Sequence, residues 1–462
     1  MKLQKFLLIL MSLMLVFTST SFIALAEGEP EPVVTNECMI VETETEYATF
    51  AEAATAVEDG QTIKLFKDIT LTSIPATTKK VTIDGDNHTI TQATYFDINS
   101  LTIKNATYTT TAEFGIWAGT LTLENVTWNH NSGYGVTLCS GSANGVVLKD
   151  STVISASAKE LIYAKNSAGA TITIENSTIT GDWNIDNNGH GGVVTYTKSA
   201  NITLNGNTVL NQNSEQGASG TNVTAFFFGT AHANLEIDST VIFNVNSVAN
   251  QENCSIVNGY RTAGVATVVD HGATYNINKD VVNAGFAYVS TAFDATNRNV
   301  NTNTIALCAD GKVYNPNAKL PTDFTADVSL KAYTTSHITN SEAVADAEAE
   351  TIRFPVAVDA EFYAAVKDSA KFGLEIVAGT LINAENGVDW ATVEGLVKDQ
   401  DSTDWDWAVE GEEYAALIEN INTDALKATK FAVCGFVTVT YTDDTTATFY
   451  AEHSVELATS LA

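Results

Sequence analysis

Basic residues are scarce in this chain. Its 462 residues include 23 lysines and arginines against 55 aspartates and glutamates, which leaves a net charge of −32 at pH 7. Nucleic acids and anionic membrane surfaces are bound through basic patches, so this balance excludes them as expected partners. The arginines are Arg261, Arg298 and Arg353 alone, which also disfavours phosphate and polyuronate ligands.

Cysteine and proline are also sparse. The five cysteines are an odd number without metal-like spacing, so they indicate no disulfide framework, although one or two bridges stay open. Six prolines argue against a linker-rich, disordered chain. The sequence also lacks a P-loop, a G-x-S-x-G elbow and an H-E-x-x-H motif, so we expect no cofactor.

Long hydrophobic runs are absent after the N-terminus. The chain begins with the basic stretch MKLQK, followed by the apolar FLLILMSLMLVF and the small residues Ala24-Leu25-Ala26. This order predicts a secretory signal peptide over 1–26, cleaved after Ala26, because twelve apolar residues are too few to span a bilayer. We therefore expect a secreted protein whose mature chain has no membrane span.

An acidic segment over 27–44 is expected to be a linker, and a short helix follows it. Thr49 and Glu52 have the spacing of a capping box. Phe50, Ala53 and Val57 then recur at helical spacing on one face. The helix is suitably placed to cap the N-terminal end of the segment that follows it.

What comes next is a repeat. The shared unit is apolar–x–apolar–polar–(Asn/Asp/Gly)–x–Thr–apolar, as in LTLENVTW from Leu121, and its steps lengthen along the chain without loss of the pattern. The first apolar positions are Val81, Leu101, Leu121, Val146, Ile172, Ile202 and Leu235. The Thr, Val and Ile content and the period of two exclude helical repeats, so the unit predicts a strand-based solenoid.

Over about 45–322 this pattern resembles the right-handed parallel β-helix of pectate-lyase-like proteins. The resemblance implies stacked coils with inward aliphatic ladders and small polar residues at the corners. Asn125-Val126-Thr127 also matches an N-glycosylation acceptor. The copies, however, carry other turn formers at this position, so we interpret it as a tight corner that needs a left-handed backbone. These copies are Asn105, Asn125, Asp150, Asn176 and Gly206.

The composition shifts after residue 325. The segment 326–462 holds a predicted hairpin in which strands around Val437 and Thr446–Tyr450 flank an Asp-rich turn. A further strand is expected in ETIRFPVAV and a helix in AEFYAAVKDSA. We therefore expect an all-β chain, in which the parallel β-helix with its capping helix is followed by a smaller, sandwich-like domain.

Two histidine-containing stretches are candidates for catalysis. WNIDNNGHGG offers Asp186 and His190, which resemble the Gly-His-Gly element of β-helix hydrolases but lack the paired carboxylates that hydrolysis needs. Asp270 and His271 form the second set, although the turn of their own repeat also explains them. The alternative for the first set is a Gly/Asn-rich turn with a solvent-facing histidine. For the second set it is the turn of the repeat, with Asp270 at the polar position.

Clustered carboxylates form a weaker calcium candidate. Asp399, Asp401 and Asp404 lie close together in the sequence, without the loop glycine of an EF-hand. A solvated acidic loop explains them equally well. Trp405 and Trp407 follow, either as core residues or as a surface on which sugars could stack.

We therefore expect a non-catalytic binding or surface-interaction protein whose partner is a polysaccharide or a cell-surface protein. The alternative is a polysaccharide-active enzyme, a lyase or a glycoside hydrolase, that uses the outer loops of the β-helix. A structural subunit of a shell or matrix is a third option. One fold hosts many functions, so the repeat itself does not decide among them.

Overall fold

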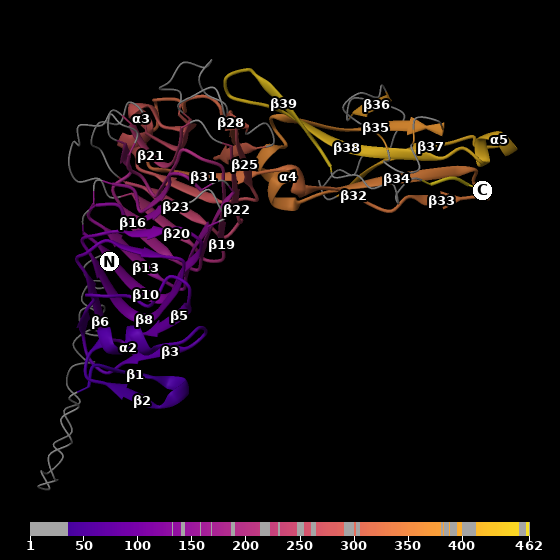
Figure 1. Cartoon of the computed structure of the whole chain (residues 1–462). Helices are drawn as coiled ribbons and strands as arrows, with labels where there is room; N and C mark the ends of the chain where they lie inside the picture. The colour runs from indigo at the N-terminus through magenta and orange to yellow at the C-terminus, as the bar shows by residue number, and fades with distance from the viewer. Residues whose placement is uncertain are drawn as a thin grey trace, which may run out of the picture. The chain divides into compact units, whose positions relative to one another are not determined.

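The computed structural model describes the chain from Asn36 onward with several gaps. The residues left out after Asn36 are 132, 140–143, 158, 168, 186–189, 213–221, 230–231, 247–253, 260–264, 291–299, 302–304, 380–381, 383–387, 389–394, 400–412, 452–458 and 462. The described part is built mainly of β-strands, with a few short helices (Figure 1).

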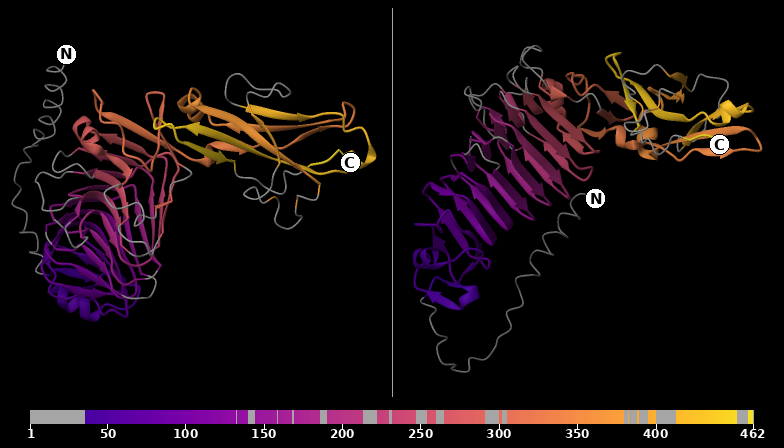
Figure 2. Two further views of the ribbon diagram at one scale, coloured as in Figure 1. Left: turned by 90° about the horizontal axis from the view of Figure 1, so that it is seen from above. Right: turned by 45° about the vertical axis from the view of Figure 1, so that its right-hand side comes forward.

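Three series of parallel strands form a solenoid, and Figure 2 shows the strands of successive coils stacked on one another. The first sheet contains β3 (Thr62–Leu65), β5 (Lys80–Asp84), the first half of β8 (Ser100–Thr110) and of β10 (Gly119–His130), β12 (Asn144–Lys149), β15 (Ala170–Glu175), β19 (Ala200–Asn205), β22 (Ala233–Ile237), β25 (Ala266–Asp270) and β28 (Val300–Asn301). The second sheet contains β4 (Ile69–Thr70), β6 (Thr89–Gln92), the second halves of β8 and β10, β13 (Thr152–Ser155), β16 (Thr178–Gly181), β20 (Val209–Gln212), β23 (Ile242–Val245) and β26 (Thr274–Ile277).

The third sheet is made of shorter strands. In spatial order it contains β7 (Phe96–Ile98), β9 (Phe114–Ile116), β11 (Val136–Leu138), β14 (Ile162–Ala164), β18 (Val194–Tyr196), β21 (Asn222–Phe228), β24 (Cys254–Gly259) and β27 (Ala287–Val289). A two-residue strand, β17 (Asn184–Ile185), pairs with β21 in the antiparallel sense. Each coil therefore passes through the three sheets in turn.

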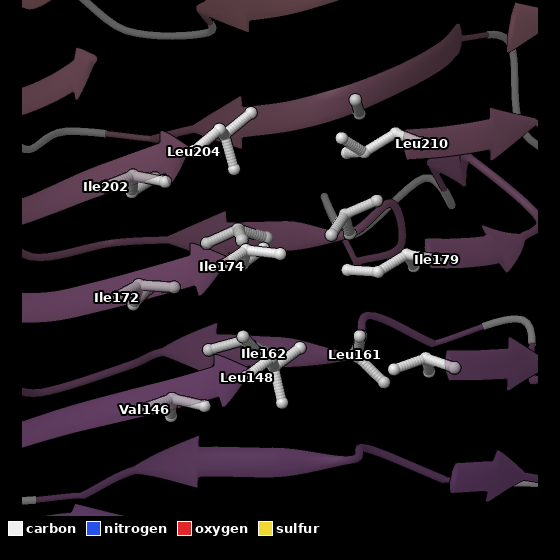
Figure 3. Close-up of a cluster of buried hydrophobic side chains, with 14 of the residues drawn as sticks. Val146, Leu148, Leu161, Ile162, Ile172, Ile174, Ile179, Ile202, Leu204 and Leu210 are labelled. Carbon is white, nitrogen blue, oxygen red and sulfur yellow. The ribbon is translucent and has the colours of Figure 1, made fainter. Parts of the chain in front are cut away.

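The predicted aliphatic ladder is confirmed. All seven first apolar positions pair in register from coil to coil, and each is at most 4% exposed. Figure 3 shows Val146, Ile172 and Ile202 one above the other, beside the column of Leu148, Ile174 and Leu204. Because successive strand side chains alternate between faces, both columns are directed into the core.

The predicted corner residues are confirmed as left-handed turns. Asn105, Asn125, Asp150, Asn176 and Gly206 have φ between +48° and +57°. Two of their side chains also link successive coils: Asn125 Nδ2 donates to Asn105 Oδ1 at 2.9 Å, and Asn105 Nδ2 donates to Asp84 Oδ1 at 3.0 Å. The Asn-x-Thr motif at Asn125 is thus a structural corner that recurs in the stack.

The N-terminal end of the solenoid is covered as expected, but the fold begins earlier. Helix α2 (Phe50–Ala56) starts at Thr49 with a complete capping box. Residues 38–44 were assigned to the linker, yet they include β1 (Cys38–Ile40) and the 3-10 helix η1 (Val41–Thr43). Strand β1 pairs antiparallel with both β2 (Thr45–Tyr47) and β3. The reason is that Cys38 and Ile40 bury their side chains.

At the other end, an antiparallel strand closes the second sheet. After α3 (Lys279–Gly285), strand β31 (Val328–Tyr333) pairs with β26 and also with β29 (Ala306–Ala309), which forms a hairpin with β30 (Lys312–Tyr314). Val328 and Leu330 belong to the solenoid core, whereas Tyr333 belongs to the core of the domain that follows. One strand is therefore shared between the two cores.

The C-terminal domain is a sandwich of two antiparallel sheets, as predicted. One contains β32 (Ile338–Asn340), β33 (Val344–Asp346), β34 (Thr351–Val358) and β37 (Glu413–Ile418), and the other β35 (Ala370–Ala378), β36 (Leu396–Asp399), β38 (Phe431–Thr440) and β39 (Thr446–Tyr450). The short helices are η4 (Thr335–His337), α4 (Ala360–Val366) and α5 (Asp424–Lys427). Tyr414 Oη donates across the sheets to Gly373 O and Phe436 O at 2.8 and 3.1 Å.

The remaining general expectations concern thiols and membranes. All five cysteines are free. Within the described residues, no helix is both long enough and apolar enough to cross a bilayer.

Candidate functional site

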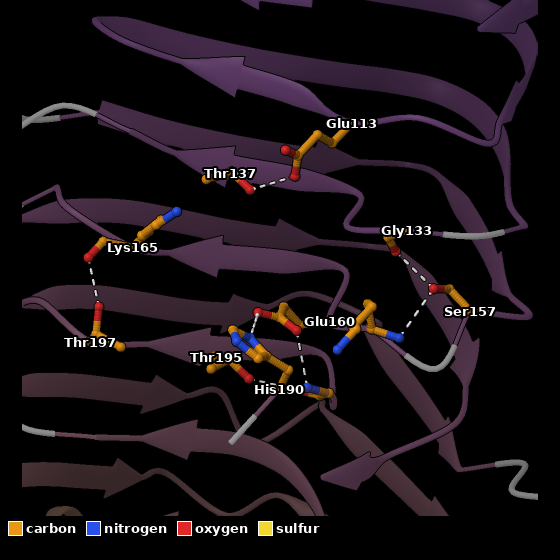
Figure 4. Close-up of polar contacts among 11 residues, drawn as sticks. Glu113, Gly133, Thr137, Ser157, Glu160, Lys165, His190, Thr195 and Thr197 are labelled. Carbon is orange, nitrogen blue, oxygen red and sulfur yellow. Dashed lines mark hydrogen bonds and ion pairs between the residues drawn. The ribbon is translucent and has the colours of Figure 1, made fainter. Parts of the chain in front are cut away.

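His190 lies on the outer side of the third sheet, just before β18, and its main partner is a buried glutamate (Figure 4). His190 Nδ1 is 2.9 Å from Glu160 Oε1, and the other carboxylate oxygen accepts from the Gly191 backbone N–H at 3.0 Å. The Glu160 side chain is fully buried, whereas that of His190 is 20% exposed. Glu160 therefore fixes the orientation of a histidine whose edge reaches the surface.

Two tyrosines from neighbouring coils surround this histidine. Tyr134 and Tyr163 are stacked with ring centroids 5.6 Å apart. Each meets His190 edge to face, at 5.5 and 5.1 Å. Lys159 Nζ lies 5.9 Å from the centre of the Tyr134 ring. We call His190, Glu160, Tyr134 and Tyr163 the histidine cluster.

The local sequence explains why the chain can place His190 here. Gly191 and Gly192 have φ of +133° and +77°, which side chains rarely tolerate. A Cβ on Gly191 would lie 1.8 Å from Asn184 O, and one on Gly192 would lie 2.7 Å from Thr224 O. Gly191 and Gly192 therefore serve close backbone packing beside β17 and β21, and this packing holds His190 against β14.

A second acidic residue lies further along the same face. Glu113, just before β9, accepts from Thr137 Oγ1 at 2.7 Å. Burial raises the pKa of Glu113 above its usual value, and the Thr137 hydrogen bond opposes this rise. Glu160 repels Glu113 electrostatically. Their strands, β9 and β14, are two positions apart in the sheet, on the order of 10 Å.

Part of the first catalytic prediction falls outside the described residues. Asp186 is not among the described residues, so of the pair Asp186 and His190 the structure places only His190. The partner that it reveals, Glu160, stands 30 positions earlier in the sequence. The chemistry available is that of an oriented imidazole edge beside the partly exposed Tyr134 ring, which suits hydrogen bonding and ring stacking with a ligand, whereas Tyr163 is buried beneath them.

Asp270 and His271 are held apart from that cluster, in the first sheet. Asp270 was expected at the polar position of its repeat, and the structure corrects this placement: it pairs with Ile237, in the aliphatic column of Leu204 and Ile174. It is fully buried and accepts from the N–H groups of Gly272 and Ala273.

Two tyrosine hydroxyls complete the surroundings of Asp270. Tyr275 Oη donates to Asp270 Oδ2, and Tyr288 Oη donates to the same atom at 3.1 Å. Burial raises the pKa of Asp270, and these hydrogen bonds oppose the rise. His271 instead lies on the surface, with Nε2 3.3 Å from Glu236 Oε1. Both carboxylate oxygens of Asp270 accept hydrogen bonds and the residue is fully buried, which indicates a structural role.

The candidate calcium ligands are only partly placed. Asp399 ends β36 in the C-terminal domain, whereas Asp401 and Asp404 lie outside the described residues, as do Trp405 and Trp407. Where the structure describes the chain, it contains no group of three or more histidine, cysteine or carboxylate side chains suited to a metal ion.

The comparison with protein families agrees with this fold. Residues 42–185 match the family model described as "Putative pectate lyase-like adhesive domain". The match covers less than half of the chain, includes Tyr134, Glu160 and Tyr163, and ends before His190. It supports a β-rich fold similar to that of pectate lyases and a role in binding, and it names no partner. Neither the curated proteins nor the solved structures contained a significant match.

Sequence reasoning missed Glu160, Tyr134 and Tyr163. Their equivalent positions in neighbouring coils could have indicated this proximity. Tyr134 and Glu160 each stand two residues before a third-sheet strand, and Val136 pairs with Ile162 in register. The third-sheet strands have only three residues here and lie outside the repeated motif, so the pattern of the first two sheets did not reveal them.

Proposed function

We propose that this protein is a secreted, non-catalytic binding protein of the adhesive type, which holds a carbohydrate or a protein partner on the outer face of its third sheet. The observation that carries the proposal is the histidine cluster: a partly exposed His190 fixed by a buried carboxylate and bordered by two tyrosine rings. The match to an adhesive domain over 42–185 supports the same role.

The burial and the hydrogen bonds of Glu160 favour a binding role over a catalytic role. Each of its oxygens already has a partner, and its side chain is fully buried. A general acid or base must come within hydrogen-bond distance of the reacting atom. Glu160 in this arrangement positions His190 and gives a rigid surface, which lowers the entropic cost of binding.

The test is retention on a panel of polysaccharides and host surface proteins, using residues 27–462. We expect His190→Ala to weaken retention about tenfold, the effect of losing a central contact. Glu160→Gln should act in the same direction, because an amide has one acceptor oxygen where the carboxylate has two, so it cannot reproduce the contacts with both His190 Nδ1 and the Gly191 N–H. His271→Ala is the matched control, since it removes a histidine–glutamate pair from the first sheet. Unchanged retention in both cluster variants would contradict the proposal.

A polysaccharide-active enzyme is the alternative, and Glu113 favours it. A carboxyl group with a raised pKa can hold the proton that a general acid donates. Glycoside hydrolysis uses a pair of carboxyl groups, and Glu113 would be the general acid of such a pair. New reducing or unsaturated ends that vanish in Glu113→Gln would establish this alternative and refute the non-catalytic role.

Secretion and the right-handed sense of the coil belong to the same proposal. The predicted signal peptide supports secretion over 1–26. Parallel strands joined by crossovers are almost always right-handed, which supports the handedness. A mature N-terminus at Glu27 in the culture medium, and a crystal structure, would test the two points.

A further inference from the structure

A second group of aromatic side chains lies exposed at the start of the third sheet. Tyr95 directly precedes β7 and Trp117 directly follows β9, and they are 43% and 50% exposed. Large aromatic side chains are usually covered, so two that stand open on adjacent strands need an explanation. Neither belongs to the histidine cluster.

One carboxylate holds both rings. Tyr95 Oη and Trp117 Nε1 each donate to Asp97 Oδ1 at 2.5 Å. Asp97 is itself exposed, and both of these hydrogen bonds are made to Oδ1 rather than Oδ2. Burial and the Asp97 hydrogen bond raise the pKa of Tyr95, so its hydroxyl remains a donor. The polar ends of the rings are fixed while much of their surface stays open.

A glycine makes this arrangement possible. Gly115 lies opposite Asp97 in the register of β7 and β9. A Cβ at this position would come within 2.0 Å of Tyr95 Oη and 2.9 Å of Asp97 Oδ1. Glycine in a strand interior weakens the strand and often marks a close approach. Here it leaves room for the tyrosine hydroxyl above the sheet.

We propose that Tyr95, Asp97 and Trp117 form a binding site for a neutral pyranose sugar. The apolar C–H face of a pyranose packs on the rings, and Asp97 Oδ2 accepts a hydrogen bond from a sugar hydroxyl. This inference rests on the proposed function and specifies its ligand.

Charge and preorganisation select this class of ligand. A net charge of −32 and a carboxylate at the centre of the site repel anionic polysaccharides. Rings already held by hydrogen bonds lose little conformational entropy when a ligand binds. A protein partner would need a contact area on the order of 1,000 Å², whereas two separate rings and a carboxylate suit a single sugar.

The experiment is affinity electrophoresis of residues 27–462 in gels that contain soluble β-glucan, galactomannan or polygalacturonate. We expect at least one neutral polymer to retard the protein, and polygalacturonate to leave it unretarded. Trp117→Ala and Asp97→Asn should weaken this retardation about tenfold. Gly115→Ala should act in the same direction by displacing Tyr95. Tyr450→Ala, which removes another aromatic residue with 42% exposure, should change nothing.

The outcomes separate this site from the proposed function. Retardation that is equal in Trp117→Ala and Asp97→Asn, with unfolding temperatures near that of the parent, overturns this site and leaves the proposed function standing. Retardation by polygalacturonate alone, or by no polysaccharide, overturns the neutral-sugar assignment. If the chain retains neither polysaccharides nor surface proteins, the proposed function fails as well.

Discussion

Asn125 shows how much a single residue decides in a solenoid. Its φ of +54° lies in the left-handed region, where a residue with an ordinary Cβ is destabilised, and its amide also bonds to Asn105 in the coil before. The same residue therefore satisfies a backbone requirement and links two coils. This double role explains why asparagine recurs at the corner without being required there.

We expect Asn125→Ala to lower the free energy of unfolding by about 1–2 kcal/mol, because alanine is strained at this φ and lacks the amide. Asn125→Gly should cost less, since glycine adopts the conformation freely. The midpoint of thermal unfolding by circular dichroism measures both. Equal losses in the two variants would show that backbone strain is not the cause.

His130 gives the stability a dependence on pH. It is fully buried at the end of β10. Gly133 O, 2.9 Å from Nε2, can only accept, so Nε2 carries the proton and Nδ1 accepts from the Ser155 hydroxyl at 2.9 Å. Burial lowers the pKa of His130 from 6.5 to about 4. Between these values the unfolded chain binds a proton that the native chain does not.

Stability from His130 is therefore complete above pH 6.5 and is lost as the pH falls towards 4, by up to about 3 kcal/mol. In His130→Gln, which cannot take up this proton, the fall in unfolding temperature from pH 7 to pH 4.5 should be smaller than in the parent chain. His88→Gln, at a partly exposed histidine, is the control. Identical pH profiles for the parent and His130→Gln would contradict this account.

At the scale of the strand, charges on the outer face of the first sheet support the register. Lys64, Asp84, Lys104, Glu124, Lys149 and Glu175 occupy one column, so the sign alternates from coil to coil. Two of the neighbouring pairs are ion pairs, Lys104 with Asp84 at 3.4 Å and Lys149 with Glu124 at 3.2 Å. A slip by one coil would bring like charges together, so the column favours a single stacking.

We expect Lys104→Glu to lower the free energy of unfolding by about 1 kcal/mol at low ionic strength, because it places three carboxylates in succession. The loss should shrink in 0.5 M salt, where such partly exposed charges are screened. Lys104→Met is the control, since it keeps the apolar stem and removes the charge. Urea denaturation at the two salt concentrations measures the effect. A loss of unfolding free energy that does not change with salt would exclude repulsion between the carboxylates as its cause.

For the molecule as a whole, β31 is the element that closes the stack. It pairs with β26, the last described strand of the second sheet, and contributes Val328 and Leu330 to the solenoid core. An unpaired edge strand is a template for association with other chains. The same strand contributes Tyr333 to the core of the C-terminal sandwich, so the stability of the two cores is coupled.

A chain that ends at Asp327, and so lacks β31 and the sandwich, should self-associate, because β26 and the core beneath it become exposed. Light scattering after size-exclusion chromatography measures this directly against the chain of residues 27–462. If the truncated chain is monodisperse and its particles contain the same number of chains as those of residues 27–462, β31 is not needed to protect the end of the solenoid.

The scaffold could be predicted from the sequence because it follows from local physical chemistry. Strand side chains alternate with a period of two, few residues tolerate a left-handed corner, and a capping box needs two residues at fixed spacing. Each of these rules acts within a few residues, so the aliphatic ladder, the corners and helix α2 were predicted. The boundary at residue 45 was wrong by one short strand, because β1 pairs with partners that only the fold brings to it.

The functional surfaces depend on contacts between coils, which cannot be derived from the local sequence pattern. Glu160 meets His190 across 30 residues, and Asp97 holds Trp117 across 20, through coils whose lengths vary. Asp270 looked like a turn residue, yet the register places it in the aliphatic column. Alternation and corner chemistry thus specify the coil from the sequence by itself. Which polar side chains come together on its surface depends on how the coils stack. The residue that lies above a given side chain depends on the lengths of all the loops between the two coils.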